Sequence, residues 1–218
     1  MNRRTVLTTL GTTAAVALGG CFGEGDDQLG TDDRNTDDHS ATDPGAGTVV
    51  EYFDMEPDRP ECEKESETVE GEHGDETREH ETAATIPYPP APEEYDETDI
   101  VTFVEKFDRA YVRHDVLCGQ RSGHILNVGY SVARSETYDW KEDITHVFLL
   151  RAAGATAGLD SDGYMWQAEL GYSAVVYAVD ETGVARTDFD DVSRLEPDEF
   201  EAHSPDPLEE GRLVAQFE

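Results

Sequence analysis

Three cysteines are the residues whose type and spacing offer the clearest chemistry. Cys21 ends an apolar run and opens a stretch rich in Asp and Gly, whereas Cys62 and Cys118 lie farther along the chain. In an oxidising compartment, Cys62 and Cys118 would form a disulfide. The bond would close a loop of 57 residues, counted from 62 to 118 inclusive, and such a closure stabilises a fold by about 4 kcal/mol in the chain-entropy model. A buried free thiol and a metal ligand remain alternatives.

Histidines near Cys118 could add donors for a metal, but the pattern is incomplete. His114, Cys118 and His124 follow one another at intervals of four and six residues. A structural zinc site needs a fourth ligand and a closed tetrahedral shell, and no CxxC or HExxH motif lies nearby. We therefore predict no metal site and no cofactor. His114 is expected at the C-terminal end of a helix or at the edge of its apolar stripe.

Aromatic residues indicate a possible binding site. The candidates share strand-like segments with an alternating pattern; they are Tyr130, Tyr164, Trp166 and Tyr172. Such a face can line a ligand cleft between a helix and a sheet, although a hydrophobic core is its commoner fate. Because the sequence has no GxSxG motif, no phosphate-binding glycine loop and no nucleophile with a recognisable base, we predict no catalytic residues.

The first 20 residues have the three regions of an export signal. Arg3 and Arg4 form a cationic start, an apolar segment follows, and the small residues Gly19 and Gly20 precede Cys21. No carboxylate occurs before Cys21. The apolar segment is shorter than the roughly 20 residues that a membrane span needs. We predict that residues 1–20 are removed after export.

These residues also resemble known targeting motifs. Arg3-Arg4 followed by Thr-Val-Leu looks like a twin-arginine signal, and Leu18-Gly19-Gly20-Cys21 looks like a lipobox. The resemblance implies that the sulfur of Cys21 carries a diacylglyceryl group, which would anchor the protein at the extracytoplasmic face of the cell membrane. The chain as a whole resembles haloarchaeal lipoproteins that combine such a signal with an acidic tether and a small α+β domain.

Charge narrows the classes of partner. The chain has 50 Asp and Glu residues against 16 Lys and Arg residues, and its formal net charge is -34. Binding to nucleic acid or to an anionic membrane surface needs clustered Lys and Arg. We predict no nucleic-acid partner, and we expect membrane contact only through the lipid on Cys21. The composition resembles that of proteins from extreme halophiles, in which salt screens repulsion between carboxylates.

Composition also divides the mature chain into two parts. Residues 21–47 are poor in apolar residues and rich in Gly, Asp and Thr, so we predict a flexible acidic tether. Residues 48–218 are enough for a single domain with a core. The domain is expected to begin with a β-hairpin, roughly residues 65–71 and 76–86, followed by a proline-rich connector over 86–95.

A helix and a sheet should form the rest of the domain. Apolar residues at three- and four-residue steps predict a long amphipathic helix from about residue 96 to 119; they are Ile100, Phe103, Val104, Phe107, Ala110, Tyr111 and His114. The pattern then alternates, which predicts strands over 123–134, 144–153 and 164–179 with turns at 136–142 and 160–163. A turn over 180–183 leads to a short strand, and residues 212–217 are expected to form an edge strand.

The predicted fold class is α+β, with the helix packed on an antiparallel meander. The order of the elements is similar to that of cystatin-like folds, and this resemblance carries no function. Three functions stay open. The first is a non-catalytic interaction or scaffolding module on the cell surface of a halophile, with an unknown protein or small-molecule partner. The second is a ligand-binding lipoprotein that uses the aromatic cleft. The third is a hydrolase or metal-dependent enzyme.

Overall fold

The computed structural model describes residues 47–73, 76–119, 123–152, 155–169 and 171–218. They all belong to one compact unit. The predicted export signal and the predicted lipidation of Cys21 lie outside the described residues. The predicted tether also lies outside them, apart from Gly47.

The described residues form a mixed α+β fold in which the paired strands of every sheet are antiparallel. The strand orders are β10-β9-β8-β5-β4, β3-β6-β7 and β1-β2. In chain order the elements are η1 (Val49–Tyr52), β1 (Thr68–His73), β2 (Glu76–Glu81), α1 (Glu97–Cys118), β3 (His124–Asn127), β4 (Val132–Lys141), β5 (Ile144–Arg151), β6 (Ala155–Leu159), β7 (Met165–Glu169), β8 (Ser173–Val179), β9 (Gly183–Phe189), η2 (Val192–Arg194), α2 (Phe200–His203), α3 (Pro207–Glu210) and β10 (Arg212–Gln216).

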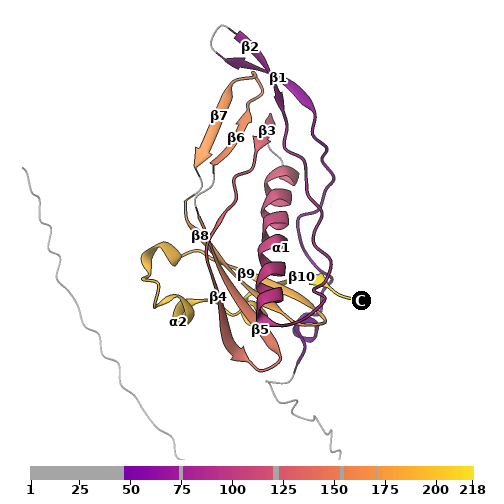
Figure 1. The fold of residues 1–218 in the computed structure, drawn as a ribbon, viewed down its shortest axis with the longest axis vertical. Coiled ribbons are helices and arrows are strands. Elements are labelled where there is room, and N and C mark those ends of the chain that lie inside the picture. The colour runs from indigo at the N-terminus through magenta and orange to yellow at the C-terminus, as the bar shows by residue number, and fades with distance from the viewer. Residues whose placement is uncertain (1–46, 74–75, 120–122, 153–154, 170) are drawn as a thin grey trace, which may run out of the picture. The chain divides into compact units, whose positions relative to one another are not determined.

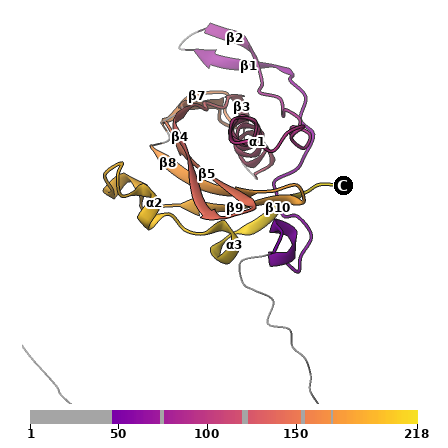
Figure 2. The same ribbon diagram turned by 60° about the horizontal axis from the view of Figure 1, so that its bottom comes forward.

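Helix α1 follows directly from the spacing of its apolar residues. Asp96 caps its N-terminus by accepting a hydrogen bond from the backbone N–H of Asp99 at 3.0 Å. Its buried stripe packs on one face of the five-stranded sheet (Figures 1 and 2), where Phe103 and Phe107 join a core with residues such as Val147 and Tyr177. The predicted helix is therefore present, with 22 residues and an acidic first turn.

The five-stranded sheet is covered on both faces. Opposite α1, residues of η2 and α2 pack on Phe148 and Val176, and η1 and α3 cover Ala178 and Ala185. Burial on both faces explains why β8 reads as an almost continuous apolar run. The predicted edge strand near the C-terminus is also present, because β10 forms one end of this sheet.

Two of the predicted strands are interrupted. The segment over 123–134 forms β3 and the start of β4, and the segment over 164–179 forms β7 and β8. The same tripeptide, Gly-Tyr-Ser, lies at both interruptions, at residues 129–131 and 171–173. Glycine weakens a strand because it has no side chain to pack, and the interruptions separate the three-stranded sheet from the five-stranded sheet.

The predicted turn over 136–142 is wrong. Strand β4 continues to Lys141 and reverses into β5 through Glu142 and Asp143. The acidic residues of this segment suggested a turn, but Tyr138 and Trp140 flank Asp139 and pack on the face opposite α1. The predicted turns over 160–163 and 180–183 are confirmed, and Gly163 has a φ of 83° in the first of them.

The predicted hairpin is present as β1 and β2, although its second arm ends at Glu81. Extended segments before and after the hairpin run along α1 (Figure 1). They are joined to each other by a bond from the backbone N–H of Thr85 to the carbonyl of Lys64 at 2.9 Å. The Tyr88 hydroxyl also donates to the carbonyl of Pro60 at 2.7 Å.

Candidate functional site

An open groove of about 640 Å³ lies between α1 and β4. One wall consists of the consecutive residues 130–135, at the start of β4 and just before it. The other wall comes from one face of α1, where the lining residues are separated by three, one and three positions; they are Thr102, Glu105, Lys106 and Arg109. Strand β4 is the end strand of its sheet, so the groove runs along a sheet edge.

The walls of this α1–β4 groove are polar. Hydroxyl groups come from Thr102, Ser131 and Ser135. Lys106 and Arg109 are exposed, and no carboxylate of the described residues lies within ion-pair distance of either cation. The Arg109 guanidinium lies 5.7 Å from the ring centroid of Tyr130. The groove thus presents two positive charges without a carboxylate partner, the negatively charged residue Glu105 and several hydrogen-bonding hydroxyls.

Arg134 also lines the groove, but its guanidinium has other partners. Its Nε donates to Glu136 at 2.7 Å. The same guanidinium lies 5.8 Å from the ring centroid of Phe200, which packs on the face of the sheet opposite α1. We therefore do not count Arg134 among the charges available in the groove.

Tyr130 connects the groove to a buried polar network. Its hydroxyl donates to the backbone carbonyl of Glu105 at 3.3 Å. Burial raises the pKa of Tyr130, and the neighbouring Asp108 carboxylate raises it further. The Tyr130 hydroxyl therefore stays protonated and can donate a hydrogen bond.

Asp108 is a carboxylate on the buried side of α1, with no exposed surface. The Tyr177 hydroxyl donates to its Oδ1 at 2.7 Å. Its Oδ2 lies 3.8 Å from Nε of Arg151 and has no hydrogen-bond partner among the described residues. Burial is the main cause that raises the pKa of Tyr177 well above its usual value, and the charge of Asp108 raises it further. Asp108 is therefore held by protein groups and is closed to solvent.

Asp188 is the second carboxylate of the network and contacts three arginines. Arg186 donates to both of its oxygens, at 2.9 and 2.6 Å. Arg151 lies 3.6 Å away and Arg212 lies 3.9 Å away. Burial alone would raise the pKa of Asp188, but the hydrogen bonds from Arg186 and the nearby positive charges outweigh it and lower this pKa.

Arg186 is the most buried cation of the network, with 3% of its surface exposed. Its guanidinium stacks 4.2 Å from the ring centroid of Tyr111, on α1. Arg212 reaches the same tyrosine and donates to its hydroxyl at 2.9 Å. These contacts bind α1 to β9 and β10, so we interpret the network as the polar part of the helix–sheet interface.

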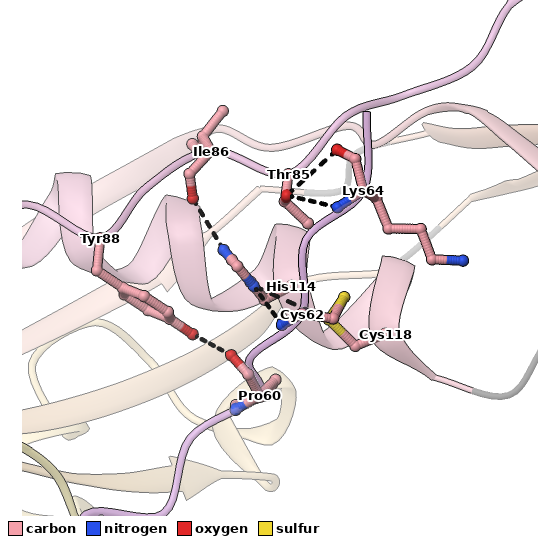
Figure 3. The surroundings of a disulfide bond; sticks show 8 residues. All are labelled: Pro60, Cys62, Lys64, Thr85, Ile86, Tyr88, His114 and Cys118. Atoms are coloured by element: carbon pink, nitrogen blue, oxygen red, sulfur yellow. Dashed lines mark hydrogen bonds between the residues drawn. A yellow bond between two sulfur atoms is a disulfide. The ribbon is translucent and has the colours of Figure 1, made fainter. Parts of the chain in front are cut away.

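The predicted disulfide is present (Figure 3). The sulfur atoms of Cys62 and Cys118 are 2.05 Å apart, and the Cα atoms are 5.8 Å apart. The bond joins the extended segment before the hairpin to the last turn of α1. Nearby, the ring of Tyr88 stacks on the ring of His114 with 4.9 Å between the centroids.

His114 is buried beside the disulfide. Its Nε2 lies 2.8 Å from the carbonyl oxygen of Ile86 and donates to it, because that oxygen can only accept. Its Nδ1 then accepts from the backbone N–H of Cys62 at 3.4 Å. Donor atoms of Cys62, His114 and Cys118 lie within 4.8 Å of one another, but the two sulfurs are bonded to each other. His124 lies elsewhere, 3.6 Å from Glu67.

The structure does not bring the four predicted cleft residues together. Tyr130 lines the α1–β4 groove, and the other three do not. Tyr164 and Tyr172 are 58% and 61% exposed. Trp166 packs over Gly158 on the neighbouring strand, where a Cβ atom would meet the indole ring at 2.6 Å. The prediction placed Tyr164, Trp166 and Tyr172 on one face of a single strand over 164–179, but this segment forms two strands, β7 and β8.

The sequence did not reveal the helix wall of the groove. Thr102, Lys106 and Arg109 lie on the polar face of α1, where charged residues are usual, so nothing distinguished them before β4 was placed beside them. A signal for the buried network was available, because Asp108 interrupts the apolar stripe between Val104 and Tyr111.

Comparison with known proteins gives no assignment: no family model matches the chain, and no curated protein or solved structure matches it significantly. Within the part of the chain that the structure describes, no helix has both the length and the apolar character needed to cross a membrane.

Proposed function

We propose that this protein is a lipid-anchored cell-surface module of a halophile that acts by non-catalytic binding, with the α1–β4 groove as its binding site. The observation that carries the proposal is the groove itself. It combines two unpaired cations, several hydroxyl groups and a sheet edge. The carboxylates of the buried network are held by arginine and tyrosine side chains, which favours binding over catalysis.

Anchoring rests on the N-terminal sequence. If Cys21 carries the lipid, the Cys21→Ser variant expressed in a haloarchaeal host should leave the membrane fraction, because the only lipid attachment point is lost. Membrane retention equal to that of the unchanged chain would show that the lipobox interpretation is wrong. The variant Thr31→Ser serves as a control, because it introduces the same residue in the predicted tether and leaves Cys21 and both disulfide cysteines in place.

Binding can be tested by thermal melting of the full chain at about 1 to 3 M salt with sugars, amino acids, peptides and metal ions. A ligand present at about 100 times its dissociation constant should stabilise the native state by about 2.7 kcal/mol. Thr102→Trp places a bulky ring in the groove and should abolish the shift. The matched control is Asp115→Trp, at an exposed position of the same helix that does not line the groove.

The position of Tyr130 favours a second candidate, a protein that binds a small ligand. Tyr130 is one of the residues predicted to line a cleft, and its protonated hydroxyl lies at the groove. In that case the melting assay should respond to one class of small molecule, and Tyr130→Phe should weaken the response. A response limited to peptides or proteins would favour the interaction module.

We also propose that the domain has a cystatin-like layout. A helix that precedes an antiparallel meander in the chain and packs on one of its faces supports this proposal. The additional sheet of β3, β6 and β7 is then an extension of the same strands. An experimental structure in which α1 packs on the opposite face of the five-stranded sheet would contradict the proposed layout.

A further inference from the structure

We propose that the α1–β4 groove binds an extended acidic peptide segment of a partner protein, which adds to β4 as a further strand of the five-stranded sheet. This inference rests on the proposed binding function and names the class of partner. It combines the exposed sheet edge with the charge of the facing helix wall.

The sheet edge supplies backbone groups. Strand β4 has ten residues and pairs with β5 on one side. On its other side, no strand of the described residues pairs with it. The outer edge of such a strand carries backbone N–H and C=O groups that can hydrogen-bond to an added strand, and strand addition is a common mode of peptide recognition.

The register of β4 limits where the peptide can pair. The pairing with β5 is irregular between Val132 and Arg134 and again between Tyr138 and Lys141. Between these irregularities, the residues from Arg134 to Tyr138 pair in continuous register. An added strand therefore has a regular stretch of about five residues to follow, roughly 17 Å at 3.4 Å per residue.

The irregularity at Ala133 also shapes the groove. Bulges bend a strand and increase its twist, and the residues around this bulge are those that line the groove opposite α1. At the other end, the Thr137 hydroxyl donates to the Glu97 carboxylate at 2.7 Å, which links β4 to the first turn of α1. Alternate side chains of an added strand would therefore face the helix wall between these two points.

The helix wall has two cationic residues against one acidic residue, Glu105, and this positive excess selects an acidic segment. Lys106 and Arg109 are exposed at the groove and have no carboxylate partner among the described residues. Complementary charge across an interface gives specificity and suppresses wrong partners. At 1 M salt the Debye length is about 3 Å, so only direct contacts retain their strength. Carboxylates on the groove-facing side of the peptide can make such contacts.

The test uses the full chain and a capped peptide in which Asp and Val alternate over about eight residues. Binding is followed by fluorescence anisotropy of a labelled peptide at about 1 M KCl. The double variant Lys106→Gln, Arg109→Gln should weaken binding about fivefold, because two partly exposed ion pairs are lost. Lys64→Gln is the matched control, since Lys64 is exposed and lies outside the groove.

Hydrogen exchange of the complex tests the strand addition itself. The peptide should slow amide exchange in β4 from Arg134 to Tyr138 and leave β10, at the opposite edge of the sheet, unchanged. The same peptide with all backbone amides methylated should not bind, because it has no N–H donors for a ladder.

Several results would overturn the inference. One is that a peptide with Lys in place of Asp binds equally well, and another is that free aspartate or inorganic phosphate competes at the same concentration as the peptide. The other two are protection of amides in β10 in place of β4, and formation of a dimer that blocks the groove. Suppose that the peptide does not bind, but a small ligand raises the melting temperature and Thr102→Trp abolishes that rise. This result would overturn the present inference alone. If Thr102→Trp changes the binding of no ligand and no peptide, the proposed binding site is overturned as well.

Discussion

Replacing Asp188 by Asn should destabilise the protein, because Asp188 is the carboxylate that faces the buried guanidinium of Arg186. Arg186 is 3% exposed and donates two hydrogen bonds to Asp188, at 2.9 and 2.6 Å. Removing one partner of a buried ion pair costs about 3 to 5 kcal/mol. The Asp188 side chain is 48% exposed, so water can replace part of the lost interaction. We therefore expect a loss of about 2 to 3 kcal/mol.

This loss should depend on pH in a defined direction. The folded-state pKa of Asp188 is lowered, and the unfolded-state pKa is about 3.9. The stability that Asp188 contributes is therefore fully present above about pH 4 and is lost as the pH falls through the folded-state value. The difference between the unchanged chain and Asp188→Asn should be largest near neutral pH and should shrink in acid.

Thermal melting at fixed salt measures the effect. For a domain of this size, 2 to 3 kcal/mol corresponds to a decrease in Tm of about 5 to 10 °C. Adding Arg186→Met should recover much of the loss, because the uncompensated charge is replaced by an apolar side chain of similar length. The reasoning would be refuted by an unchanged Tm in Asp188→Asn, or by a double variant that is less stable than the single one.

Three further perturbations test other parts of the fold. Replacing Cys62 and Cys118 together by Ala should lower the free energy of unfolding by about 4 kcal/mol in urea titrations, because the long loop is no longer closed; an unchanged urea midpoint would contradict this. Burial lowers the folded-state pKa of His146 despite the opposing charge of Asp206, so the unfolded chain binds the proton first and the protein loses stability below about pH 6.5. His146→Phe should reduce this loss. Stability measured against pH for both proteins tests the prediction, and equal losses in acid would contradict it. Asp96→Ala should cost about 1 kcal/mol through loss of the α1 N-cap, and amide exchange that stays equally slow in the first turn would argue against it.

The sequence was sufficient where a local pattern determines the structure. The three- and four-residue spacing of apolar residues identified α1. Turns rich in Asp and Gly marked the reversals over 160–163 and 180–183. The disulfide was predictable because two cysteines remain after Cys21 is assigned to the lipid. Each of these features depends on residues close in sequence or on simple counting.

The sequence was insufficient where the partner of a residue lies on another strand. The charges of Glu136 and Asp139 suggested a turn, yet both residues belong to an edge strand whose residues Tyr138 and Trp140 pack on the sheet. Arg186 and Asp188 alternate with buried residues of β9, but nothing local shows that Asp188 meets Arg151 of β5 or that Arg186 stacks on Tyr111 of α1. Only the strand order brings these groups together, and single-sequence periodicity does not determine strand order.

Two groups of cations around α1 differ in what lies opposite them. Arg151, Arg186 and Arg212 lie near Asp188 and hold the helix on the sheet. Lys106 and Arg109 project from another face of the same helix and lack a carboxylate partner among the described residues. The first group is satisfied within the fold, so substitutions there should change stability more than binding. The second group contributes little to the fold, so substitutions there should change binding more than stability. Because the groups share no ion-pair partner, the effects of combining one change from each should be additive.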